Sequence, residues 1–175
     1  MPRIPYANEG EEALGANPVY QEFKKNFGAV PNLLKLVGHS GPATQALGGL
    51  MKIFFGELSI PPRVREIAYL TVAKHNGCAY CQGHHIPLAK QAGLSSEQIA
   101  LLDRAGFNSE KLTEAERAVV RFAYETSHDV AASDEALKQL KRHFKLPEIV
   151  DIAFVVAAGN FIQRIGRNFG VELER

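Results

Sequence analysis

Residues 61–93 are PPRVREIAYLTVAKHNGCAYCQGHHIPLAKQAG, and their pattern predicts two successive helices. The first half of this stretch has apolar residues at the spacing of a helix rather than a strand, namely Val64, Ile67, Ala68, Leu70 and Ala73. The pair Asn76-Gly77 predicts the end of that helix. The cysteines follow at once, so a second helix is expected over about residues 78–92, ending at Gly93, with a kink at Pro87.

The helical spacing continues on both sides of this stretch. Two capping boxes, Ser95 to Gln98 and Thr113 to Glu116, predict helices that end near residues 106 and 128. Further helices are expected over about residues 17–27 with Asn17 as the N-cap, 42–55, 134–144 and from Pro147 onward, with a short apolar piece at 33–37. Because no alternating strand pattern survives, the sequence predicts an all-α fold.

The last predicted helix is unusually apolar. Its core side is expected to carry Ile149, Ile152, Ala153, Val156, Ala157 and Phe161. Apolar residues nevertheless lie on more than one face of this helix, so burying them requires more than one packing partner. We therefore expect a homo-oligomer, with a trimer or hexamer favoured, a preference that also draws on the resemblance described below.

Composition excludes several classes of function. Twenty Lys and Arg against nineteen Asp and Glu give a net charge of +1, with no basic block, so no nucleic-acid partner is expected. The apolar run 149–158 contains Asp151 and is too short to cross a bilayer, and the first residues lack a signal peptide, so no membrane partner is expected. The sequence predicts a single cytoplasmic domain over residues 1–175.

The chain's only two cysteines form a C-x-x-C pair, and in the cytoplasm such a pair is typical of a catalytic or metal-binding site. Offsets of three, four and seven residues place Cys78, Cys81 and His85 on one helix face. A thiol at a helix N-terminus favours the thiolate, and a nearby imidazole can take its proton. Glu66 on the preceding helix can approach His85 and orient it. This combination predicts thiol redox chemistry.

Other interpretations of the same residues are less favoured. Cys78, Cys81, His84 and His85 are four potential zinc ligands, but one helix cannot wrap them tetrahedrally around an ion, so no metal is expected. Glu66 could be a solvated residue paired with Arg63 or Arg65. His84 points about 100° away from His85 and is expected at the surface.

The order Glu66, Cys78, Cys81, His85 on two successive helices resembles the signature of the alkylhydroperoxidase D-like branch of the carboxymuconolactone decarboxylase superfamily. The segments 112–129 and 159–171 are similar to the C-terminal half of its peroxidase-related members. The resemblance implies a single-domain helical bundle of about seven to nine helices. It also implies an oligomeric enzyme that reduces hydroperoxides through a dithiol/disulfide cycle, without a cofactor.

By this resemblance Cys81 is the thiolate that attacks the peroxide and Cys78 resolves the sulfenic acid as a disulfide, with His85 and Glu66 relaying the proton. An external dithiol or protein reductant restores the thiols. Residue 80 departs from the pattern, because the best-known members have histidine there and this chain has Tyr80, a poor base near neutrality. Tyr80 is expected to line the substrate site. The alternatives are a protein-disulfide oxidoreductase without fast peroxide reactivity and a decarboxylase or lyase of the same superfamily.

Overall fold

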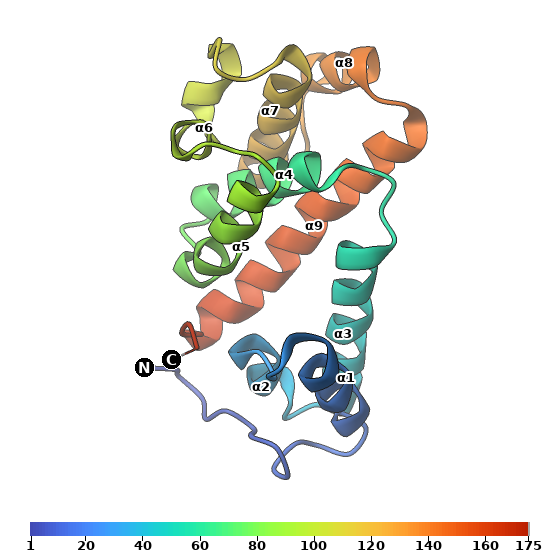
Figure 1. The fold of residues 1–175 in the computed structure, drawn as a ribbon, viewed down its shortest axis with the longest axis vertical. Helices are drawn as coiled ribbons and strands as arrows, with labels where there is room; N and C mark the ends of the chain where they lie inside the picture. The colour runs from blue at the N-terminus through green and yellow to red at the C-terminus, as the bar shows by residue number, and fades with distance from the viewer. Residues whose placement is uncertain (175) are drawn as a thin grey trace. The chain divides into compact units, whose positions relative to one another are not determined.

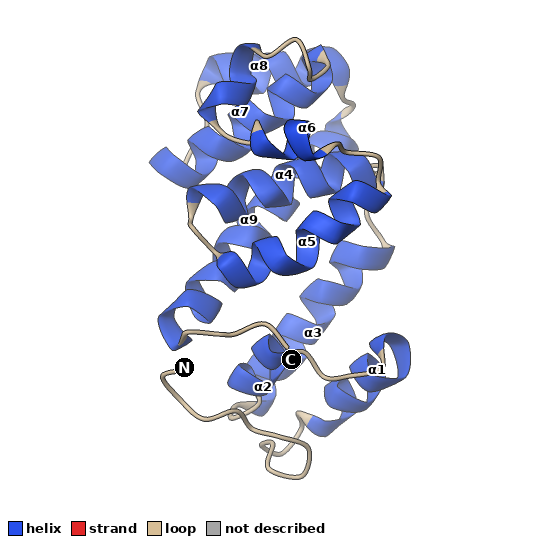
Figure 2. Cartoon of the chain, turned by 60° about the vertical axis from the view of Figure 1, so that its left-hand side comes forward, coloured by secondary structure: helices blue, strands red, loops and turns tan. Residues whose placement is uncertain are grey.

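The structure, a computed structural model, describes residues 1–174 and consists of helices joined by short loops (Figure 1). Within these residues there are nine α-helices, one 3-10 helix and no strand (Figure 2). The predicted all-α class and helix number are confirmed. The chain forms two compact units, which we call the terminal unit, Met1–Glu57 with Arg164 onward, and the central unit, Leu58–Gln163. The single domain expected over residues 1–175 stays a prediction.

The helix bounds agree with most of those expected from the sequence. In chain order the elements are α1 Asn17–Phe27, α2 Asn32–Val37, α3 Gly41–Gly56, α4 Pro62–His75, α5 Ala79–Gln91, α6 Ser96–Ala100, the 3-10 helix η1 Arg104–Asn108, α7 Glu114–Asp129, α8 Asp134–His143 and α9 Leu146–Phe169. The first three belong to the terminal unit, α4 to α8 belong to the central unit, and α9 contributes residues to both.

Helix α4 forms the core of the central unit, with α5 and α7 packed against it (Figure 2). Eight consecutive residues, from Glu66 to Ala73, are buried, because the helix is apolar on nearly every side. Burial all round is typical of a helix enclosed by others. It also means that the one carboxylate in this run, Glu66, is removed from water.

The terminal unit has its own small core. Leu33, Leu34 and Leu36 of α2 are buried there. The fully buried Tyr20 of α1 donates its hydroxyl to the carbonyl of Ala7 at 2.7 Å, which satisfies both polar groups. The unit therefore combines apolar packing with at least one buried polar anchor.

Both predicted capping boxes are present, at Ser95 and Thr113. The helix after Ser95 is shorter than expected, because α6 ends at Ala100 and the chain continues as η1, with Asp103 accepting from the N–H of Ala105 at 2.8 Å. An Asp side chain that bonds to the backbone in this way competes with a continuing α-helix. The expectation that one helix reaches residue 106 was wrong.

The start of α1 also differs from the expectation. The residue at the N-cap position is Ala16, without a side-chain cap, and Asn17 instead donates its amide to Glu12. Pro18 fits the first turn as predicted, since its missing N–H would have no partner there.

Helix α9 buries less of its apolar surface than expected. Ile149, Ile152 and Val156 are buried, but Ala157 is exposed and Phe161 is 47% exposed. At about 100° per residue, Phe161 lies roughly 120° around the helix from Ile149, so one packed face cannot include both. Placing Ala157 and Phe161 on the core side was therefore wrong.

By length and composition α9 is the one helix among residues 1–174 that is long and apolar enough to cross a membrane, with a mean hydropathy of 1.4. Half of that window is buried within the protein. The core helix of a soluble protein has the same composition, so the finding is weak evidence for a membrane span.

Candidate functional site

The turn between α4 and α5 fixes where the first cysteine lies. The N–H of Cys78 bonds to the carbonyl of Ala73 at 2.9 Å, and the N–H of Gly77 bonds to Lys74 at 3.0 Å. These two bonds are those of a Schellman motif, which requires a left-handed residue between them. Gly77 supplies it with φ of 62°, a conformation that costs glycine little. The Asn76-Gly77-Cys78 order therefore ends α4 and starts α5 at the cysteine.

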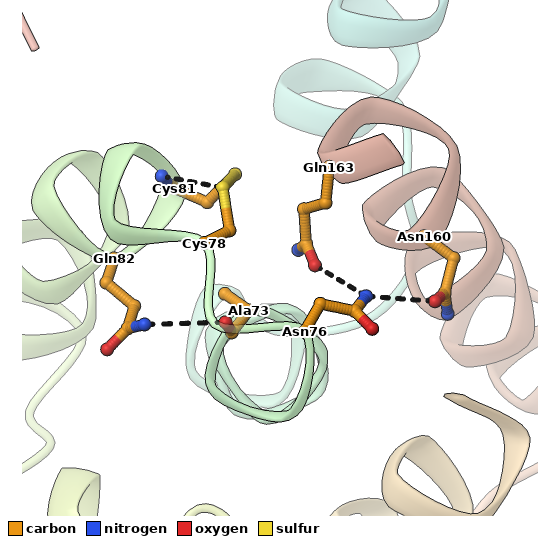
Figure 3. Close-up of a disulfide and its surroundings, with 7 residues drawn as sticks. All are labelled: Ala73, Asn76, Cys78, Cys81, Gln82, Asn160 and Gln163. Carbon is orange, nitrogen blue, oxygen red and sulfur yellow. Dashed lines mark hydrogen bonds between the residues drawn. A yellow bond between two sulfur atoms is a disulfide. The ribbon is translucent and has the colours of Figure 1, made fainter. Parts of the chain in front are cut away.

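Cys78 and Cys81 form a disulfide at the first turn of α5, with their Cα atoms 5.4 Å apart. Cys78 is the N-cap residue, and its Sγ accepts the N–H of Cys81 at 3.3 Å (Figure 3). Both cysteines are nearly inaccessible, at 1% and 3% exposure. A thiolate at this position would meet the N–H groups and the positive end of the helix dipole.

Glu66 lies against His85, across the α4–α5 interface. Its Oε2 is 2.7 Å from His85 Nδ1, and its Oε1 accepts from Arg65 Nε at 3.0 Å. Glu66 is fully buried and His85 is 7% exposed, so the interpretation of Glu66 as a solvated residue is wrong, although the pairing with Arg65 that it included is present. Two donors satisfy a carboxylate that would otherwise be costly to bury.

The contact with Glu66 decides which nitrogen of His85 carries the proton. Because a carboxylate only accepts, Nδ1 carries the hydrogen, and the lone pair of the neutral ring lies on Nε2. His85 follows Cys81 by one helical turn on α5. The arrangement can take a thiol proton at Nε2 and stabilise the resulting imidazolium at Nδ1.

Tyr69 covers the face of the same imidazole. The two ring centroids are 3.8 Å apart with the planes 26° apart, so the rings stack. Burial raises the pKa of the Tyr69 hydroxyl, the Gln163 amide lowers it by less, and the charge of Glu66 raises it further. Tyr69 therefore stays neutral, and Glu66 and Tyr69 together fix the plane and direction of His85.

A row of amides borders the disulfide on the side of α9 (Figure 3). The Nδ2 of Asn76 donates to Gln163 Oε1 at 2.8 Å and to Asn160 Oδ1 at 3.0 Å. Asn160 in turn donates to the carbonyl of Val156 and to Ser127, each at 3.0 Å. Gln163 is 1% exposed. The row links the end of α4 with α9 and α7 within the central unit.

The remaining predicted residues lie along α5. Tyr80, between the cysteines, is 8% exposed and meets the ring of His84 edge-on at 4.6 Å. His84 itself is exposed. Among residues 1–174 no group of three or more His, Cys, Asp or Glu is placed to hold a metal ion.

Sequence reasoning missed three residues at this site. Tyr69 follows Glu66 by three positions on α4, a spacing that shares one face, so this position was open to prediction. The sequence predicts Asn76 only as a turn residue. Gln163 meets Asn76 across 87 positions of sequence, and no local pattern indicates such a contact.

Comparison with known proteins finds a family likeness over part of the chain. Residues 44–125 match the carboxymuconolactone decarboxylase family. The resemblance to the alkylhydroperoxidase D-like branch, recognised from Glu66, Cys78, Cys81 and His85, is confirmed, since this family match and similar structures named as AhpD or peroxidase-related proteins support it. No curated protein sequence matches the chain.

Three solved structures illustrate the likeness. A putative antioxidant defence protein AhpD from Agrobacterium tumefaciens is 27% identical, with a TM-score of 0.70 over 79% of this chain and 95% of that one. A peroxidase-related protein from Silicibacter is 19% identical, with a TM-score of 0.77 over 99% and 90%. The debrominase Bmp8, solved with 2,3,4-tribromopyrrole, is 23% identical, with a TM-score of 0.78 over 97% and 90%. The last two show the fold alone.

Proposed function

We propose that the protein is a thiol-dependent peroxidase that reduces hydroperoxides through Cys78 and Cys81. The observation that carries the proposal is the buried contact between Glu66 and His85, at 2.7 Å, on the helices that carry and precede the cysteine pair. A buried carboxylate that orients an imidazole beside a thiol is the arrangement of an activated nucleophile. The family of the chain, which contains enzymes, agrees with a catalytic role.

In the first step His85 takes the proton of Cys81 at Nε2, and the thiolate attacks one oxygen of the hydroperoxide. An S–O bond forms while the O–O bond breaks, so the sulfur loses two electrons to the peroxide. The departing alkoxide receives a proton from the imidazolium and leaves as an alcohol. Cys81 is left as a sulfenic acid.

In the second step Cys78 resolves the sulfenic acid. Its sulfur attacks that of Cys81, and water leaves with the sulfenic oxygen, which produces the disulfide that the structure contains. An external dithiol then reduces this disulfide to two thiols and is itself oxidised. The N–H of Cys81, which points at the Cys78 sulfur, stabilises that sulfur whenever it is a thiolate.

The burial of both cysteines favours a small substrate. The two cysteines are 1% and 3% exposed, so a small hydroperoxide reaches their sulfurs more readily than a disulfide on the surface of another protein does. This supports the peroxidase over the protein-disulfide oxidoreductase. Tyr80, buried beside Cys81, is the side chain we propose to line the path of the substrate's organic group.

The test is to mix the reduced protein with one equivalent of cumene hydroperoxide and count the free thiols. We expect two thiols to disappear per chain, with cumyl alcohol formed in equal amount. Cys78→Ser should form a sulfenic acid at Cys81 that dimedone traps, whereas Cys81→Ser should form none. Both variants should lose turnover with dithiothreitol as reductant.

Three outcomes would contradict the proposal in different ways. If the parent protein keeps both thiols, it is not a peroxidase. If dimedone labels Cys78 in the Cys81→Ser variant, the two cysteines have exchanged roles. If a model disulfide oxidises the parent much faster than cumene hydroperoxide does, the protein is a disulfide oxidoreductase.

A further inference from the structure

We propose that Gln163 is a catalytic residue whose Nε2–H donates a hydrogen bond to an oxygen of the hydroperoxide. This inference rests on the proposed peroxidase function and adds a substrate-binding group to it. Figure 3 shows the Gln163 carboxamide projecting from α9, with its nitrogen on the side of the disulfide and its oxygen on the side of Asn76. The amide thus presents a donor toward the cysteine pair.

A chain of hydrogen bonds fixes which side of the Gln163 amide carries the nitrogen and which carries the oxygen. The carbonyl of Val156 can only accept, so the atom of Asn160 that bonds to it is the nitrogen, and Oδ1 faces Asn76. Asn76 must then present its nitrogen to that oxygen, and the same nitrogen reaches Gln163 at 2.8 Å. Gln163 therefore offers its oxygen to Asn76 and its nitrogen to the opposite side.

The amide nitrogen so directed has no hydrogen-bond partner among residues 1–174, although Gln163 is 1% exposed. The same amide is close enough to the Tyr69 hydroxyl to lower its pKa. A buried donor without an acceptor costs free energy, and such groups in folded proteins call for an explanation. A substrate oxygen that arrives during turnover supplies the missing acceptor.

The chemistry of the reaction fits this donor. As the thiolate attacks, the O–O bond lengthens and negative charge develops on oxygen. A donor fixed by its neighbours stabilises that charge without reorganising, and removal of one such donor typically slows an enzyme about 10²–10³-fold. The disulfide-reducing half of the cycle involves no oxygen atom, so the same donor has no part in it.

The difference between the two half-reactions provides the experiment. We expect Gln163→Met, which keeps the length of the side chain but has no donor, to slow oxidation of the reduced protein by cumene hydroperoxide at least about tenfold. Reduction of the disulfide by dithiothreitol should stay within about twofold of the parent. Gln163→Asn, which keeps the amide and withdraws it by one methylene, tests the same point if the Met variant does not fold. Because the chain has no tryptophan, both reactions are followed by acid quenching, alkylation of the free thiols and mass spectrometry, and thermal unfolding checks the fold.

The Tyr69→Phe variant distinguishes hydrogen bonding of Gln163 to the substrate from a role in which Gln163 only holds the Tyr69 hydroxyl in place. If the amide serves the substrate, loss of the Tyr69 hydroxyl should slow oxidation much less than Gln163→Met does. Equal losses in the two variants, or equal slowing of oxidation and reduction in Gln163→Met, would overturn the assignment. So would a parental oxidation rate in both Gln163 variants. A parent that does not react with the hydroperoxide overturns the peroxidase itself, and the inference with it.

Discussion

At the scale of single residues, the site combines the buried carboxylate of Glu66 and its two partners with the uncharged ring of Tyr69. Glu66 bonds to Arg65 and His85 and is fully buried, while Tyr69 covers the imidazole and remains neutral. In the proposed mechanism Glu66 acts on the thiol only through His85. We therefore expect Glu66 to be a positioning residue, with its contribution in the rate of proton transfer.

We predict that Glu66→Gln slows oxidation of the reduced protein by at least about 100-fold, because the neutral amide cannot stabilise the imidazolium. His85→Gln should lose a similar factor, and the double variant little more, since groups that act as one unit are not additive. Stopped-flow oxidation at pH 7 measures all three.

The control for this prediction is Glu114→Gln, a substitution of an exposed carboxylate in the same unit, which should leave the rate unchanged. Denaturant unfolding is measured alongside, because Arg65 also loses its charged partner in Glu66→Gln. If Glu66→Gln is oxidised within about twofold of the parent rate, Glu66 takes no part in the proton transfer.

At the scale of elements, α4 and α7 are joined where both begin. Arg63 Nε donates to Glu116 Oε1 at 2.6 Å, and Glu116 Oε2 accepts the N–H of Thr113 at 2.8 Å. Burial on its own would raise the pKa of Glu116, but the Thr113 N–H and the Arg63 guanidinium together lower it. One carboxylate thus closes the capping box of α7 and ties it to the helix that carries Glu66.

This contact predicts a pH dependence of stability. The folded pKa of Glu116 lies below the ordinary value of 4.5, so its contribution is complete above about pH 4.5 and is lost as the pH falls through the lowered folded value. Glu116→Gln should therefore cost about 1–2 kcal/mol of unfolding free energy at pH 7 and less at pH 3. Urea unfolding of parent and variant at both pH values measures the difference. An equal loss at the two pH values would show that the charge of Glu116 does not matter.

At the scale of the whole molecule, α9 leaves apolar side chains at the surface of the single chain. Val150 is 66% exposed and Phe161 is 47% exposed. Scattered apolar residues are common on monomers, but two such residues on one helix agree with the expected self-association. The cytoplasmic location expected from the sequence stays a prediction.

We predict that the protein is a homo-oligomer, most readily a trimer or hexamer, and that Phe161→Glu weakens the assembly because it places a charge on the apolar face of α9. Light scattering coupled to gel filtration, at micromolar concentration, gives the mass of both proteins. A monomeric parent would rule the prediction out. Thr113→Ala, which removes the cap of α7, is a matched control that should lower stability by about 1 kcal/mol without changing the mass.

The sequence alone determined what depends on neighbours along the chain. Helical spacing, the capping boxes at Ser95 and Thr113 and the Asn76-Gly77 stop signal each act over a few residues, so they could be interpreted without the fold. The placement of Cys78, Cys81 and His85 on one helix follows from the same local geometry. Errors arose at Asn17 and after Ala100, where side chains bond to the backbone or to residues outside the helix.

Only the tertiary structure decided how distant side chains meet. It buried Glu66 completely, brought its carboxylate to His85, stacked Tyr69 on the imidazole and brought Gln163 to the disulfide. It also turned Phe161 outward. These contacts depend on how deeply the helices pack and how each is rotated about its axis. That geometry results from the sum of many weak side-chain contacts, and no short sequence pattern predicts it.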